Sequence, residues 1–585
     1  MTIYKVPQQE LQFILKHLIN YSELCKMPGY EDASEDMVAA ILPEAAKFFE
    51  QIVAPTNWPS NSQPAYLQNN QVITSPALEG VYQQMVEAGW CSLSGATEFG
   101  GAGFPVVIDA VVQEMLQSSN VGFSLLPTLT RGVIHALNLY GSESQKQRYL
   151  QQLISGKWSG TMNLTESHAG SDLSAVKTKA VPAGDHYLIS GQKIYITWGD
   201  HEQAENIIHL VLARLPDAPE GNQGISLFLV PKYLINEDGS LGDRNDVQAV
   251  GVEHKLGIHS SPTCTLAFGD KAGAVGYLVG PLNQGLMCMF SMMNHARLAV
   301  GHQGVAVGER SYQQALDYAS QRVQGAVQGV EGRAPIIHHP DVKRMLLQMR
   351  ALTEAGRAMS FATMAAEDRA THHPQPEIRA QNALRVEVMT PLVKGWCTEM
   401  AMETTSLGVQ VHGGMGFIEE TGAAQHMRDA RILPIYEGTN GIQALDFIGR
   451  KCLRDQGEGI KQLLADMSQA IEANQTEPSK SLIAGLQIAL NQCQSALEHV
   501  LKHPQKAPFV AYQFMMLLGN SVAYWQLAVL GCAAAEKIQA GDQDEFLKQK
   551  LATAQFYKTQ ILPRNQAHLE AILADAEFID NLKLN

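Results

Sequence analysis

The chain has 585 residues, of which 45% are hydrophobic and 17% are charged, as in a globular protein with material for several domains. It carries 43 basic and 58 acidic residues, a net charge of −15. This acidic balance argues against nucleic acid as the main partner, although it leaves room for a local basic patch.

The eight cysteines are scattered and none forms a Cys-x-x-Cys pair, so we expect neither a metal site nor a redox pair. Scattered free thiols are typical of a reducing compartment. The first residues lack the apolar core of a signal peptide, and we expect no membrane span. We therefore expect a cytoplasmic protein.

The first part of the chain has helical patterns. Residues 1–40 are expected to form an N-terminal extension, and residues 41–160 a helical domain. A helix is predicted to begin at Ser34–Glu35, and another to follow Ser142, which has capping-box spacing to Gln145. The glycines at 100–103 follow no clear strand and therefore do not predict a dinucleotide fold.

The pattern changes to strands near residue 161 and returns to helices near residue 281. Segments 187–191, 193–197, 207–213 and 225–231 have strand composition, which predicts a β domain over 161–280, as a small barrel or sandwich. Long apolar-periodic runs predict a helical bundle over 281–450 and a further helical domain over 465–585. The fold class is mainly α with a central β domain.

A single carboxylate stands out in Tyr-Glu-Gly-Thr-Asn-Gly-Ile-Gln at 436–443. Gly438 lets the backbone approach a ligand, and Thr439 and Asn440 are typical of a helix cap. Glu437 could act as a base if burial raises its pKa. On these eight residues alone, an ordinary first-turn glutamate favoured by the helix dipole is the stronger interpretation.

Two further motifs accompany this segment: Thr-Glu-Ser-His-Ala-Gly-Ser-Asp at 165–172, and Val-Gln-Val-His-Gly-Gly-Met-Gly-Phe at 409–417. Together the three motifs resemble the acyl-CoA dehydrogenase family, over about residues 78–450. The length, with extra segments at both ends, resembles a long bacterial subgroup. That subgroup includes 3-methylmercaptopropionyl-CoA dehydrogenases and broad-range and long-chain enzymes.

The resemblance implies FAD-dependent α,β-dehydrogenation of an acyl-CoA thioester to the trans-2-enoyl-CoA. It implies Glu437 as the catalytic base and flavin N5 as the hydride acceptor, with FAD lying between the β domain and the bundle. The backbone N–H of Glu437 is implied as one hydrogen-bond donor to the thioester oxygen. An electron-transfer flavoprotein is implied as the partner, and the protein as a homodimer.

The resemblance also implies further site residues. Those for FAD are Thr165, Ser171, Tyr195, Thr197, Arg322, Gln410, Gly413, Gly414 and Thr439. Those for the substrate are Ser171, Asn294, Arg297 and Gly438. Each has an ordinary alternative: loop polarity for Thr165 and Ser171, strand alternation for Tyr195 and Thr197, and a helix-end surface position for Arg322.

The sequence departs from the family pattern at three places. Ser167 stands where the family commonly has proline, Val323-Gln324-Gly325 where a Phe-Gly pair is usual, and Gly441 where a glutamine is common. We interpret His168 as a solvated loop histidine rather than a ligand.

Two other readings share the same motifs. An acyl-CoA oxidase would return its electrons to oxygen, and a non-catalytic protein would keep the fold without turnover. A serine hydrolase and a P-loop kinase are disfavoured because their glycine motifs are missing from the sequence. Fatty acyl and methylmercaptopropionyl thioesters both stay open as substrates.

Overall fold

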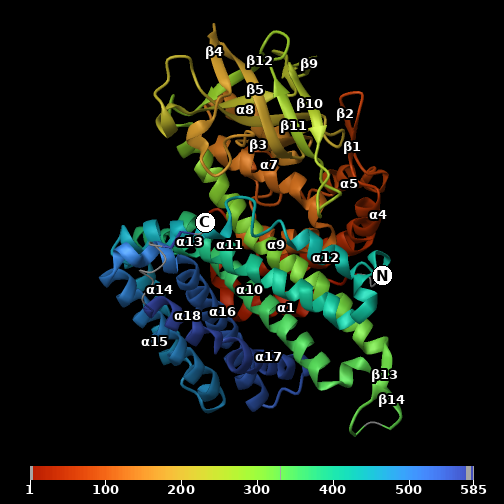
Figure 1. Ribbon diagram of the computed structural model, residues 1–585, viewed down its shortest axis with the longest axis vertical. Helices are drawn as coiled ribbons and strands as arrows, with labels where there is room; N and C mark the ends of the chain where they lie inside the picture. The colour runs from red at the N-terminus through yellow and green to blue at the C-terminus, as the bar shows by residue number, and fades with distance from the viewer. Residues whose placement is uncertain (1–3, 330, 575–581, 584–585) are drawn as a thin grey trace. The chain divides into compact units, whose positions relative to one another are not determined.

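The structure is a computed structural model that describes residues 4–329, 331–574 and 582–583 (Figure 1). Its chain divides into two compact units. The helical unit consists of Met1–Ala46, Pro105–Ser118 and Arg297–Asn585, and the sheet unit of Lys47–Phe104 and Ser119–Ala296.

The sheet unit is built on one curled eight-stranded sheet (Figure 1). Seven of its strands follow the order β10-β11-β5-β12-β7-β6-β3, and the eighth, β4, pairs with β5. Its strands are β3 (Trp158–Asn163), β4 (Lys179–Ala183), β5 (His186–Thr197), β6 (Asn206–Ala213), β7 (Ser226–Pro231), β10 (Val247–Val252), β11 (Thr263–Phe268) and β12 (Ala274–Val279). The β3–β6 pair is parallel and the other ladders of this sheet are antiparallel. Every residue of β3, β6 and β7 is buried, which explains the nearly continuous apolar composition of β6 and β7.

The segments 187–191 and 193–197 are halves of one strand, β5. The strand passes through Gly191, which has a φ of +147°. On one side of this glycine β5 pairs with β4 and β12, and on the other with β11. The sheet therefore curls around a bend that the composition of the two halves did not reveal.

Short hairpins and helices complete the sheet unit. They are β1 (Tyr66–Gln68), β2 (Gln71–Ile73), β8 (Tyr233–Ile235), β9 (Leu241–Arg244), α4 (Asn57–Ser62), α5 (Val81–Glu87), α7 (Val121–Tyr140) and α8 (Glu143–Ser155). The capping box predicted at Ser142 is confirmed at the start of α8. Helix α7 packs on β3 so closely that a Cβ on Gly160 would lie 2.6 Å from Val133.

Long helices form the core of the helical unit. They are α9 (Gly285–Gln321, which begins in the sheet unit), α10 (Pro340–His372) and α11 (Pro376–His412), joined by α6 (Val106–Ser119). Shorter elements are α1 (Gln8–Ile14), α2 (Tyr21–Leu24), α3 (Glu35–Phe48), β13 (Val323–Ala326), β14 (Arg333–Pro335), α12 (Ala423–Ala430) and α13 (Asn440–Ile448). Cβ atoms on Gly301 and Gly304 would lie 2.6 and 2.5 Å from carbonyl oxygens of α11, so α9 and α11 approach backbone to backbone.

The C-terminal helices belong to the same unit. They are α14 (Glu458–Ala473), α15 (Lys480–Lys502), α16 (Ala507–Gln539), α17 (Glu545–Phe556) and α18 (Arg564–Leu573). Helix α16 packs against α10, α11 and α13. The stretch Pro504–Gln539 is long and apolar enough to cross a membrane, but 89% of its most apolar window is buried inside the protein, as in a core helix. The prediction of a mainly α chain with a central β domain is confirmed.

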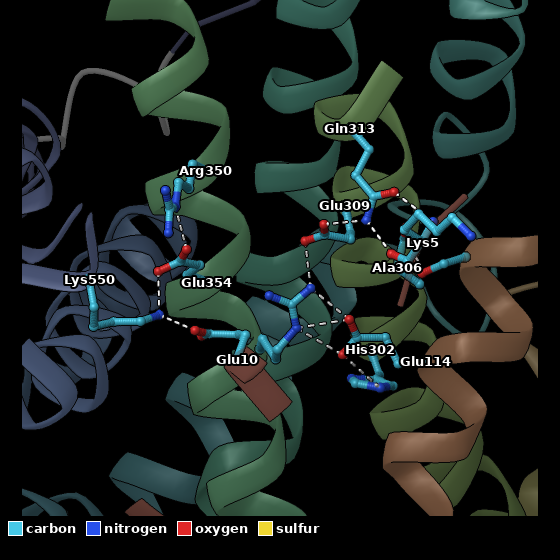
Figure 2. Close-up of polar contacts among 12 residues, drawn as sticks. Lys5, Glu10, Glu114, His302, Ala306, Glu309, Gln313, Arg350, Glu354 and Lys550 are labelled. Carbon is cyan, nitrogen blue, oxygen red and sulfur yellow. Dashed lines mark hydrogen bonds and ion pairs between the residues drawn. The ribbon is translucent and has the colours of Figure 1, made fainter. Parts of the chain in front are cut away.

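Buried charges join the N-terminal and C-terminal segments to this core. Lys550 on α17 has no exposed surface and lies between Glu10 on α1 and Glu354 on α10 (Figure 2). Arg350 also binds Glu354, with an Nε–Oε1 distance of 2.6 Å. Arg357, which follows Glu354 by about one turn of α10, pairs with carboxylates of α6 and α9. The charged groups therefore compensate one another within the core, as buried charges must.

Candidate active site

Glu437 lies in the loop between α12 and α13. The predicted cap is confirmed, because the Thr439 hydroxyl accepts a hydrogen bond from the N–H of Ile442 at 3.3 Å. Glu437 precedes this cap by two residues and is therefore not a first-turn residue of α13. Its φ is +56°, a left-handed conformation that is uncommon outside glycine. Such strain persists only where surrounding contacts hold the backbone in place.

Three hydrogen bonds hold this backbone. The N–H of Asn440 donates to the carbonyl of Pro434 at 3.0 Å and closes the loop around Glu437. Arg297 on α9 donates from Nε to the carbonyl of Glu437 at 3.2 Å. Gln443 on α13 donates to the same carbonyl at 3.3 Å. The main chain of the loop is therefore fixed from α9 and from α13.

The carboxylate of Glu437, by contrast, has no hydrogen bond or ion pair with any described residue, and its backbone N–H has no described acceptor either. Burial raises the pKa of Glu437 to about 7, while the positive charges of Arg297 and Lys394 oppose this rise. A carboxyl group with such a pKa is half ionised near neutral pH, where a general base works best.

Lys394, on α11, also lies at this site, although the sequence analysis did not identify it. Its side chain has no exposed surface, and Nζ donates a hydrogen bond to the side-chain oxygen of Asn440 at 2.8 Å. Burial lowers the pKa of Lys394 to about 7, although the charge of Glu437 opposes this. The available signal was a lone lysine within the otherwise uncharged run 388–398.

Of the residues predicted for the substrate, two lie at the Glu437 loop. Arg297 is buried against it, as described. Gly438 has a φ of +89°, and a Cβ there would lie 2.8 Å from the side-chain nitrogen of Gln443. The loop thus requires glycine at this place. Asn294, also on α9, belongs to the sheet unit and is exposed.

The sheet unit brings Thr165 and Tyr195 close together. Thr165 is half-buried in the loop after β3, and its carbonyl accepts a hydrogen bond from the N–H of Ile194 at 2.9 Å. Tyr195 follows on β5 with 60% of its surface exposed and a φ of +60°. Thr197 ends β5, opposite Thr263 of β11. Three of the residues predicted to contact the cofactor therefore lie around the end of one strand.

A buried ion pair supports this loop, and the sequence analysis did not identify it. Glu166 pairs with Lys193 at 2.8 Å and accepts backbone hydrogen bonds from Lys177 at 2.8 Å and Thr178 at 3.0 Å. Although burial acts the other way, Lys193 and these hydrogen bonds lower the pKa of Glu166. The loop thus keeps a defined conformation with Ser167 in the place of the usual proline. Ser171 is exposed beyond it.

The remaining predicted residues lie at the ends of α9 and α11 and at the start of α13. The rings of Tyr318 and His412 stack there with centroids 4.4 Å apart. Arg322 is exposed just beyond α9, and Gln410 is exposed on the last turn of α11. Gly413 and Gly414 follow, with open space where a Cβ would lie. Thr439 is exposed at the start of α13.

Four family models match the chain. They are described as the acyl-CoA dehydrogenase N-terminal domain (residues 39–157), middle domain (161–271) and C-terminal domain (283–453), and as the acetyl-CoA dehydrogenase C-terminal-like domain (463–580). These matches define the class as thioester-oxidising flavoenzymes. The chain belongs to the acyl-CoA dehydrogenase family, whose members are FAD-dependent enzymes.

Full-length relatives extend the comparison. The chain is 47% identical to the 3-methylmercaptopropionyl-CoA dehydrogenase of Ruegeria pomeroyi, over 96% of each chain. It is 32% identical to the broad-specificity linear acyl-CoA dehydrogenase FadE5 of Mycobacterium tuberculosis, over 99% of this chain and 98% of the relative. The Caenorhabditis elegans ACDH-11 structure in complex with C11-CoA has a TM-score of 0.75 at 20% identity, covering 98% of this chain and 96% of that one, and so shares its fold.

The predicted cofactor residues fit FAD by their chemistry. Thr165 and Thr197 bring neutral hydroxyls to the end of β5, where the ring of Tyr195 is exposed, and Ser171 offers a further exposed hydroxyl; such groups suit a flavin. The exposed guanidinium of Arg322 suits a pyrophosphate, and the open backbone at Gly413 permits close approach of a ligand.

Proposed function

We propose that Glu437 is the base with which this protein oxidises an acyl-CoA thioester to the trans-2-enoyl-CoA. The observation that carries the proposal is the pairing of a fixed main chain with a free carboxylate. The carbonyl of Glu437 is held by Arg297 and Gln443, whereas its carboxylate has no described partner. Its pKa, raised to about 7, suits proton removal at neutral pH.

In the proposed reaction, the carboxylate of Glu437 takes the proton from the α-carbon of the thioester. The electron pair of that C–H bond becomes the second bond between the α- and β-carbons. When bound, FAD supplies the acceptor for the hydride that leaves the β-carbon. The backbone N–H of Glu437, which has no described acceptor, holds the thioester oxygen while negative charge develops there.

The other predicted residues have holding roles in this proposal. Thr165, Ser171, Tyr195 and Thr197 would contact the flavin. Arg322 would bind the pyrophosphate, and Thr439 and the 410–414 segment would contribute further contacts. Asn294, Arg297 and Gly438 would shape the substrate end.

We further propose a homodimer that passes its electrons to an electron-transfer flavoprotein, as the family resemblance implies. Gln410, Gly413 and Gly414 are exposed close to Phe417, which is 86% exposed, and a second subunit would cover such a surface. The competing oxidase would be recognised by rapid reoxidation in air without an added electron acceptor.

For the substrate we propose a short thioether thioester, 3-methylmercaptopropionyl-CoA, because the relative of that name shares 47% identity. Purified enzyme would be tested with this thioester, butyryl-CoA and long linear acyl-CoAs, using an artificial electron acceptor. The highest kcat/KM is expected for the thioether chain. A clear preference for a long linear chain would contradict the substrate but leave the reaction class intact.

The proposed base is tested with Glu437→Gln, which keeps size and polarity but removes basicity. Turnover should fall by at least ~10²–10⁴-fold, while FAD content and thioester binding persist. The matched control is Glu458→Gln, since Glu458 is an exposed first-turn glutamate of α14. Glu437→Gln with control-like turnover would refute the proposed base.

A further inference from the structure

Lys394 is an unusual residue for the place it occupies. It lies on α11 within the uncharged run 388–398, and its side chain has no exposed surface. A buried ammonium group is unfavourable unless it is well bonded. Lys394 nevertheless takes part in no ion pair among the described residues. Its Nζ donates to a neutral partner, the side-chain oxygen of Asn440, at 2.8 Å.

Asn440 is the first residue of α13, and its side chain is bonded at both ends. Its oxygen accepts from Lys394, and its nitrogen donates to Thr398 at 2.9 Å and to Glu399 at 2.8 Å, both on α11. Its backbone N–H closes the loop by donating to Pro434 at 3.0 Å. One side chain therefore ties the start of α13, and with it the loop, to α11.

The loop needs such a tie because its central residue is strained. Glu437 has a φ of +56°, and only two residues separate it from Asn440. A backbone in this conformation relaxes when the contacts around it loosen. Relaxation would swing the carboxylate, and a displacement of ~1 Å of a reacting group can lower a rate by ~10²-fold.

The helix that carries Lys394 is itself held on two sides. Gly301 and Gly304 bring α9 against the backbone of α11 at Val393 and Cys397. On α16, Met515 packs on Gly395, where a Cβ would lie 2.5 Å from its sulfur. Lys394 thus projects from a rigid segment toward Asn440.

We propose that Lys394 is a positioning residue for the base: by bonding Asn440 from a rigid segment of α11, it fixes the strained loop that aims Glu437. This inference rests on the proposed role of Glu437. It concerns the aim and the charge of the base rather than contact with the substrate.

The ammonium also acts on Glu437 through space, together with other charges around it. The charged or titratable groups of the surrounding elements are Arg297 on α9, Lys394 and Glu399 on α11, Asp446 on α13, Arg450 just after α13, and Tyr512 on α16. Arg297 and Lys394 lower the pKa of the base against the effect of burial. Loss of the Lys394 charge therefore raises the pKa of Glu437, and less of the base is ionised at pH 7.

Two variants separate the effect of the Lys394–Asn440 hydrogen bond from the effect of the Lys394 charge. Lys394→Met removes both the hydrogen bond and the charge, whereas Asn440→Ala removes the hydrogen bond and keeps the lysine. Both should lower kcat by ~10–100-fold with little change in KM, per FAD-loaded subunit. Lys394→Met should in addition move the acid limb of kcat/KM upward by ~1 pH unit. Hydrogen exchange followed by mass spectrometry should show faster exchange in residues 434–443 for both variants.

The matched control is Lys550→Met, which removes an equally buried lysine from α17 of the same unit. It should lower stability without moving the acid limb or changing exchange at 434–443. Lys394→Met with a wild-type limb and wild-type kcat would overturn the proposal, as would a loss of activity that only follows FAD content. Should Lys394→Met fail to fold, Asn440→Ala decides: wild-type kcat and exchange would overturn it.

The parallel result for Glu437→Gln keeps the two proposals apart. If that variant is inactive while Lys394→Met and Asn440→Ala behave as wild type, only the positioning role fails. If Glu437→Gln turns over normally, the proposed base itself is wrong.

Discussion

The helical unit buries lysines beside carboxylates at two places, with opposite chemical results. At Lys550 the ammonium contacts Glu10 and Glu354 directly, and Arg350 adds a second cation to Glu354 (Figure 2). At Lys394 the ammonium is bonded to Asn440, and the carboxylate of Glu437 has no ion pair among the described residues.

The pKa values follow this difference in bonding. Burial alone would raise the pKa of Glu354, but the charges of Lys550 and Arg350 lower it to about 2. Burial raises the pKa of Glu437 to about 7, because Arg297 and Lys394 act on its carboxylate only through space. Glu10 shares its cation with a second carboxylate, and there burial prevails and raises the pKa.

The comparison shows how one set of residue types serves two purposes. Where two cations bond directly to one carboxylate, as at Glu354, they keep it ionised and inert, and the cluster joins segments of the chain. Cations bonded to neighbouring neutral groups instead orient the loop and leave the carboxylate available to a substrate. Reactivity therefore depends on where the hydrogen bonds go, rather than on the presence of lysine and glutamate.

The largest expected effect is the loss of stability when the buried cluster of Lys550, Glu10 and Glu354 is broken. Lys550→Met leaves Glu10 and Glu354 without their shared cation, and removing one partner of a buried ion pair typically costs ~3–5 kcal/mol. Adding Glu10→Met should recover most of this loss, because Glu354 keeps Arg350 at 2.6 Å. Denaturant unfolding of the two variants would measure both values. Equal instability of the single and double variants would contradict this account of the cluster.

A smaller expected effect is the pH dependence of stability, which has opposite signs at Glu354 and at Glu437. The pKa of Glu354 in the folded protein is about 2, below its usual 4.5, so its contribution to stability is present above pH 4.5 and is lost as the pH falls toward 2. The pKa of Glu437 is raised to about 7, so the folded state loses stability as the pH rises from 4.5 to 7.

Thermal unfolding at pH 8 and pH 5 tests these signs. Glu354→Gln should lower Tm at both pH values. Glu437→Gln should raise Tm at pH 8, with the gain shrinking at pH 5, where the wild-type carboxyl group is already protonated. A Glu437→Gln variant that is less stable than wild type at pH 8 would contradict the view that the base is held at a cost to stability.

Much of the fold could be predicted because local signals agreed with the final structure. Ser142 caps α8 as its spacing indicated, and the apolar-periodic runs became α10, α11 and α16. The bend of β5 at Gly191 could not be predicted, because the pairing change from β12 to β11 depends on distant strands.

The candidate active site also has features that the sequence predicts and features that it does not. The cap at Thr439 could be identified from its local motif, whereas the prediction for Glu437 depends on the resemblance that three separate motifs carry. Lys394 and Gln443 could not be identified, since their roles depend on which residues meet them: Lys394 precedes Asn440 by 46 positions. Likewise, the support of Glu166 by Lys193 arises only when β5 lies beside the loop after β3.

The most direct test of the central claim is the pH dependence of kcat/KM for the wild-type enzyme. It would be measured from pH 5 to pH 9 with a thioester deuterated at the α-carbon, so that proton removal limits the rate. Because kcat/KM reports ionisations of the free enzyme, an unpaired Glu437 predicts an acid limb at about pH 7, with a primary isotope effect. A profile that stays flat down to pH 5, as for an ordinary or ion-paired carboxylate, would contradict the account.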